Sequence, residues 1–220
     1  MQDWGAHVER EAARYRDGEA RLGDAADTDT RQRQLTRMGN AAWGAGLSEL
    51  MHGRRRDASE WLHLAADRYR ESWSTGPPGS WGRPIAAMKA LLLAGGADGA
   101  AEVAQQTIDA QAADADSPIG RYAAALALLV IGRDHEARHV AAAIRDRDDF
   151  PPAVADALAT LAAGDRAGYL VAVEDVLESF ETREEFLEDV PVADMVLVLQ
   201  ELARVRDLEV DLPASAFLPS

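Results

Sequence analysis

The chain has no cysteine and only one lysine, Lys89, among its 220 residues. Without cysteine it has neither disulfides nor thiolate ligands for a metal ion. Lys89 interrupts the best apolar run, so no segment approaches the roughly 18 residues needed to cross a bilayer. The first residues carry neither a basic flank nor an apolar stretch. We therefore expect no secretory signal, no membrane span and a cytoplasmic location.

Acidic residues outnumber basic ones, and the net charge is −15. An aspartate-rich, lysine-poor composition is typical of adaptation to a cytoplasm at very high salt, where surface repulsion is screened. The excess is uneven, because residues 1–110 carry a net charge of −2 and residues 111–220 carry −13. Salt adaptation does not require that asymmetry. Nucleic acid and anionic membrane are poor partners for the acidic half, so we expect a protein partner instead.

Apolar residues recur at helical spacing along the chain, and no segment alternates cleanly enough to be a strand. Four glycines, each followed by an aspartate and a small residue, read as helix stops: Gly53, Gly96, Gly132 and Gly164. A glycine stop followed by an N-cap is the chemistry of a short helical hairpin. The spacings of 43, 36 and 32 residues are close to those of tetratricopeptide-like repeats. We predict an all-α, right-handed stack of antiparallel helical hairpins, a tetratricopeptide-like superhelix forming one domain over residues 1–220.

One break divides the N-terminal helices from the later hairpins. Residues 76–79 read Gly-Pro-Pro-Gly and cannot be helical, because proline lacks an amide donor and restricts the residue before it. Trp73 and Trp81 flank the break, and Arg83-Pro84 opens the next helix. Because these large rings can pack on neighbouring helices, we predict that the loop at 76–84 is held in one conformation. The tryptophans Trp43, Trp61, Trp73 and Trp81 either pack in the core, which we expect, or line a groove.

Three features are predicted near the C-terminus. Thr182 and Glu185 have the spacing of a capping box and predict a short tenth helix. Pro191 then begins a last long helix, since its length and apolar spacing favour a helix over a strand. The tail from Asp211 holds two prolines and is expected to lie extended over the fold.

The sharpest chemical motif is His135-Glu136-Ala137-Arg138-His139, which matches H-E-x-x-H. Two histidines four residues apart on a helix can bind zinc, with the glutamate as general base. Here the motif opens a helix directly after a tight turn, Arg138 places a cation between the ligands, and no third ligand is marked. We therefore expect a solvated helix start with no cofactor and no metal, and keep His135 and His139 as weak metal candidates.

The densest charge lies between residues 174 and 189, which hold eight acids and one base. This segment is either a solvated helix face or a docking surface for a basic protein, whose encounter rate and specificity it would raise. Four acids surround the turn at Thr182 and are the candidates for partner binding: Glu181, Glu184, Glu185 and Glu188.

Three short pieces of the sequence resemble the immunity protein 49 family, helical proteins encoded with polymorphic toxins. They run from Ala66 to Trp73, from Trp81 to Gly95, and from Leu202 to Pro219. The resemblance implies neutralisation of a toxin by direct binding. It places no partner-binding residue on this chain.

The expected function is non-catalytic protein binding, most specifically of an immunity or antitoxin kind with a basic toxin domain as partner. No phosphate-binding loop, nucleophile elbow or catalytic triad is visible. One alternative is a general helical-repeat scaffold that binds an extended peptide. A second is a metal-dependent hydrolase that uses His135 and His139.

Overall fold

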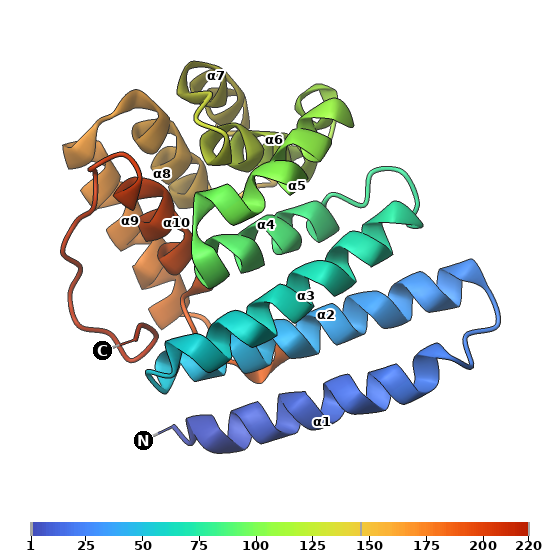
Figure 1. The fold of residues 1–220 in the computed structure, drawn as a ribbon. Coiled ribbons are helices and arrows are strands. Elements are labelled where there is room, and N and C mark those ends of the chain that lie inside the picture. The colour runs from blue at the N-terminus through green and yellow to red at the C-terminus, as the bar shows by residue number, and fades with distance from the viewer. Residues whose placement is uncertain (1, 146, 220) are drawn as a thin grey trace.

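The computed structural model describes residues 2–145 and 147–219. Within them the chain forms ten α-helices and two short 3₁₀ turns (Figure 1). The first five helices are α1 Trp4–Leu22, α2 Thr28–Met51, α3 Arg55–Ser74, α4 Gly82–Gly95 and α5 Ala97–Asp109. The others are α6 Pro118–Val130, α7 Asp134–Arg145, α8 Pro152–Ala163, α9 Arg166–Glu181 and α10 Asp194–Arg204. The 3₁₀ turns are η1 Ala112–Asp114 and η2 Leu187–Asp189.

Helices α1 to α9 each pack chiefly against their neighbours in sequence, so the fold is a stack of consecutive helices. Figure 1 shows the long helices α1, α2 and α3 side by side at one end, with the shorter helices stacked beyond them. The last helix, α10, returns to pack against α4, α8 and α9. No strand is present in the described residues. The all-α stack predicted from the sequence is confirmed.

The predicted turns between the hairpins are also confirmed. Gly53, Gly96, Gly132 and Gly164 all have positive φ, between 69° and 88°. A side chain at such a position clashes with its own backbone, so glycine ends the helix here at little cost. Of the caps predicted after these glycines, Asp165 caps α9 by accepting from the amide of Gly168, whereas α3 and α5 have no side-chain cap within the described residues, so Asp57 and Asp98 only lie in their first turns. Ser117 accepts from the amide of Gly120 and caps α6.

The prediction for residues 182–193 is wrong. Thr182 and Glu185 form no capping box, because the backbone after α9 bends at residues 182 and 184 and leads into the 3₁₀ turn η2 without forming a helix. The last helix begins at Asp194 and not at Pro191. Two effects prevent a helix: Glu188 and Asp189 have positive φ of 56° and 54°, and Pro191 holds the preceding residue in an extended conformation.

Arg83 ties the loop at 76–84 to helix α2. Its guanidinium donates to Thr36 at 3.3 Å and to Gln32, both on α2. A Cβ added to Gly76 would lie 1.8 Å from Nη1 of Arg83, so the loop packs closely over this side chain at residue 76. Trp73 and Trp81 are both half-buried, and Trp81 packs against the core and against Gly120 of α6.

The tail after α10 runs extended over α9 and α10, as predicted. The backbone oxygen of Phe217 accepts from the amide of Ala193 at 2.8 Å, and the Phe217 ring stacks on Phe186 at 5.5 Å. Gln200 donates to the backbone oxygen of Val210 at 2.7 Å. Among the helices of the described residues, none has both the length and the apolar character needed to cross a membrane.

Candidate functional site

The acids of residues 174–189 fall into two groups with different surroundings. Seven are exposed and form no ion pair within residues 2–145 and 147–219. They are Glu174, Asp175, Glu178 and Glu181 on α9, Glu184 and Glu185 in the segment that follows, and Asp189 in η2. The one cation among them, Arg183, lies 3.6 Å from the ring centroid of Phe180 and neutralises none of them. The exposed acids therefore present uncompensated negative charge.

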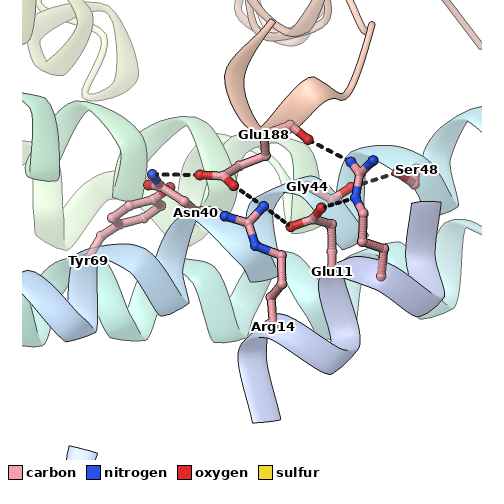
Figure 2. Close-up of polar contacts among 8 residues, drawn as sticks. Glu11, Arg14, Asn40, Gly44, Ser48, Tyr69 and Glu188 are labelled. Carbon is pink, nitrogen blue, oxygen red and sulfur yellow. Dashed lines mark hydrogen bonds and ion pairs between the residues drawn. The ribbon is translucent and has the colours of Figure 1, made fainter. Parts of the chain in front are cut away.

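Glu188 belongs to a different environment, a polar network that joins η2 to the first two helices (Figure 2). Its side chain is 12% exposed and pairs with Arg14 of α1. Asn40 of α2 donates to the same carboxylate at 3.1 Å, and Arg10 donates to the backbone oxygen of Glu188 at 2.7 Å. The other three candidate acids do not share these contacts, so Glu188 anchors the segment on which they lie.

At the centre of this network is Glu11, a carboxylate with no solvent exposure. It accepts from Arg10 at 2.7 Å and from Arg14 at 3.0 Å. A buried carboxylate is tolerated when charged partners satisfy its oxygens, and two guanidinium groups do so here. Gly44 leaves the space, because a Cβ at that position would lie 3.1 Å from Cγ of Glu11 (Figure 2).

The protonation states of Arg14 and Tyr69 fix the orientation of the network. Burial opposes the charge of Arg14, but the carboxylates of Glu11 and Glu188 outweigh it and raise the pKa of Arg14. Burial raises the pKa of Tyr69, whose hydroxyl therefore stays protonated and donates to Asn40 at 2.9 Å. With its oxygen engaged by Tyr69, the Asn40 amide points its nitrogen at Glu188.

The network holds η2 in a conformation that its residues do not prefer. A positive φ at two consecutive non-glycine residues costs about 1–3 kcal/mol each, and both Glu188 and Asp189 adopt one. The neighbouring Leu187 is left 58% exposed, although leucine is normally buried in such a segment. The anchors therefore fix a backbone that presents a large apolar side chain to solvent.

Leu187 lines an open groove of about 650 Å³. The walls come from α2, α3, the central loop, the start of α4, the start of α6 and η2. The main apolar residues of the groove are Trp81, Ala86, Ile119 and Leu187, and its polar rim includes Asn40, Ser80, Arg83 and Ser117. Ile119 is 43% exposed. Two of the few large apolar side chains exposed on the described surface thus share one concave site.

Arg83 lines the same groove, but its guanidinium is already engaged. Its bonds to Gln32 and Thr36 hold it against α2, and Nη1 is buried under Gly76. Burial lowers the pKa of Arg83. Its role in the groove is to fix the loop that carries Trp81.

The two histidines of the H-E-x-x-H motif lie together on the exposed face of α7. Their ring centroids are 4.8 Å apart, and both side chains are exposed. Glu136 is paired with Arg133, whose hydrogen bond lowers the pKa of Glu136. Within the described part of the chain no group of three potential ligands gathers around a metal position. The geometry therefore lends a zinc centre no support.

Sequence reasoning did not single out Glu11, Arg14, Asn40, Ile119 or Leu187. A signal was available for Glu11, since it lies between Val8, Ala12 and Tyr15 on the apolar stripe of the first helix. An acid on such a stripe indicates a buried, paired carboxylate. No pattern in the sequence joins Asn40 to residue 188 or Ile119 to residue 187.

Comparisons of this chain with protein-family models, with curated proteins and with solved structures find no match.

Proposed function

We propose that this protein is a non-catalytic binding module that neutralises a basic toxin domain by direct contact, as an immunity protein does. One observation carries the proposal: the segment from Glu181 to Asp189 is anchored by buried polar contacts and yet leaves Leu187 and four carboxylates in solvent. A strained, rigid segment with an exposed leucine has no evident purpose in folding. It does have the features of a contact surface, namely an apolar centre with a charged rim.

The negative charge of this surface favours a basic protein as the partner. Glu181, Glu184 and Glu185 are exposed and belong to the half of the chain with net charge −13. Such a field attracts a basic protein and repels nucleic acid and anionic lipid. The resemblance to toxin immunity proteins supports the same kind of partner. In this proposal the protein acts in the cytoplasm and needs no cofactor.

The groove of about 650 Å³ favours one alternative, a helical-repeat scaffold that binds an extended peptide. The two functions differ in the form of the partner. An immunity protein binds a folded domain through a broad surface, whereas a peptide scaffold binds an unfolded segment with the same affinity as its parent protein. No metal-dependent reaction is proposed, since His135 and His139 lack a third ligand among the described residues.

The experiment is a calorimetric titration of this protein against the product of the gene encoded beside it. The test variant changes Glu181, Glu184 and Glu185 to glutamine and keeps Glu188, which the fold needs. Glutamine at 181 still accepts the hydrogen bond from Ser215. The matched control makes the same change of three charges elsewhere, with Glu9→Gln, Asp24→Asn and Asp67→Asn, all exposed.

We expect the test variant to bind at least tenfold more weakly, a loss of about 1.4 kcal/mol, and the control to bind like the original protein. Equal weakening of both variants would show a general effect of net charge, and no binding by the original protein would contradict the proposal.

A further inference from the structure

We infer that the groove between Leu187, Trp81 and Ile119 receives one apolar side chain from a basic segment of the partner. This inference rests on the proposed function and deepens it. It names the position of the apolar contact and the chemistry of the segment that makes it, whereas the exposed acids alone indicate only the sign of the partner's charge.

The groove has the physical form of a pocket for an anchoring side chain. Leu187 and Ile119 keep 58% and 43% of their surface in solvent, and both line the same concavity as the half-buried Trp81. Each buried Å² of apolar surface contributes about 25 cal/mol, so covering these residues favours an apolar occupant. Aromatic and aliphatic anchors in central pockets dominate the energy of many protein interfaces.

Both sides of the groove are fixed before any partner arrives. Leu187 follows the backbone of η2, which Arg10, Arg14 and Asn40 hold through Glu188. Trp81 is placed by its contact with Gly120, where a Cβ would approach the indole to 2.9 Å. A preformed site loses little conformational entropy on binding, which raises affinity without further contacts.

The charges beside the groove select a basic segment. Glu184 and Glu185 precede Leu187 by three and two residues, and Asp116 precedes the groove residue Ser117. All three are exposed, and none forms an ion pair in the part of the chain that the structure describes. Arg147, which donates to the backbone oxygen of Asp116, is paired with Asp149.

Among the described groove residues Arg83 is the only cation, and its guanidinium is bonded to α2. The carboxylates of Glu184, Glu185 and Asp116 are therefore available to pair with a basic segment. An arginine or lysine on either side of the anchoring side chain would face these carboxylates, and such pairs add specificity and speed encounter.

The probe is a nine-residue alanine peptide with a central phenylalanine and an arginine two positions to either side, blocked at both ends. One control peptide has serine at the centre, and another has glutamate in place of both arginines. Binding to the full chain is measured by fluorescence polarisation at low salt. We expect each control peptide to bind at least tenfold more weakly than the probe.

The groove is tested from the protein side with Leu187→Asn and Ile119→Asn, which change exposed side chains and should leave the melting temperature unchanged. Each variant should bind the probe peptide at least tenfold more weakly than the original protein does. The control is Val171→Asn, which changes an exposed apolar side chain outside the groove and should bind the probe normally. Leu91 is not suitable for this purpose because its side chain packs on the core.

Equal affinity for the phenylalanine and serine peptides, or failure of the probe to saturate the protein by about 1 mM, would overturn the inference. The outcome is separable from that of the proposed function. If the product of the adjacent gene binds and depends on Glu181, Glu184 and Glu185, but binds Leu187→Asn and Ile119→Asn unchanged, only the groove is wrong. If that product does not bind at all, the proposed function fails, and the peptide series still decides the groove.

Discussion

Asn40 and Glu188 are 148 positions apart in the chain and are joined by a hydrogen bond of 3.1 Å. Asn40 also accepts the hydroxyl of Tyr69 at 2.9 Å, so α2, α3 and η2 meet at this amide. The contact links the long N-terminal helices to the segment that carries the candidate binding residues. The stability of the N-terminal layer and the geometry of the site therefore depend on the same polar network.

The first prediction concerns the anchor. Glu188→Ala removes the partner of Arg14 and Asn40 and should lower the free energy of unfolding by about 2–3 kcal/mol. For a chain of this length that corresponds to roughly 4–12 °C in melting temperature. The control is Glu184→Ala, which changes an exposed acid without an ion-pair partner in the described residues and should stay within about 0.5 kcal/mol. Equal melting temperatures for both variants would show that the contacts of Glu188 do not contribute to stability.

The second prediction separates close packing from helix propensity. A Cβ at Gly39 would lie 2.7 Å from the ring of Tyr69, which orients Asn40. Gly39→Ala should therefore cost about 1–3 kcal/mol through overpacking, despite the better helix propensity of alanine. At Gly95 a Cβ meets nothing within 4 Å, so Gly95→Ala should be neutral or stabilising. Chemical denaturation of both variants compares their free energies of unfolding. A stabilised Gly39→Ala would show that the Tyr69 ring moves to make room for the added methyl group.

Much of the fold could be predicted because it follows from local chemistry. Gly132 and Gly164 end helices through their own backbone freedom, Asp165 caps the helix after Gly164, and Ser117 caps α6. These effects depend on residues within one turn of each other, so the sequence displays them directly. The all-α hairpin stack follows from repeating them.

Residues 182–193 could not be predicted because their conformation is set by distant partners. Thr182 and Glu185 have the local pattern of a capping box, but Glu188 is held by Arg14 and Asn40 from the other end of the chain. These contacts offset the strain of a positive φ, which no local rule anticipates. The same cause made Glu188 look like an exposed acid equivalent to Glu185.

The third prediction concerns pH. Burial lowers the pKa of His7 below its ordinary value of 6.5, and Arg10 lowers it further. The folded protein then binds this proton more weakly than the unfolded chain. The contribution of His7 to stability is present above pH 6.5 and decreases as the pH falls through that value. Denaturation of His7→Gln between pH 7.5 and 5.5 should show a smaller loss of stability than the original protein. An identical slope would mean that the His7 ring titrates as it does in the unfolded chain.

The fourth prediction concerns the H-E-x-x-H motif. Purified protein should contain no stoichiometric zinc, because His135 and His139 are exposed and Glu136 is held by Arg133. His139→Ala should leave the metal content and the melting temperature unchanged. Metal analysis of both proteins is the measurement, and zinc that disappears in His139→Ala would show that a third ligand is recruited.

The most direct test of the binding account is the association rate of this protein with the product of the adjacent gene, measured by stopped flow at several salt concentrations. Rim charges act chiefly on the association rate and on its salt dependence. The variant with Glu181, Glu184 and Glu185 changed to glutamine should associate more slowly at low salt and lose part of the salt dependence. At about 1 M salt, where the Debye length is roughly 3 Å, the two proteins should associate at similar rates. Identical rates at every salt concentration would contradict the account and leave these acids as a solvated surface.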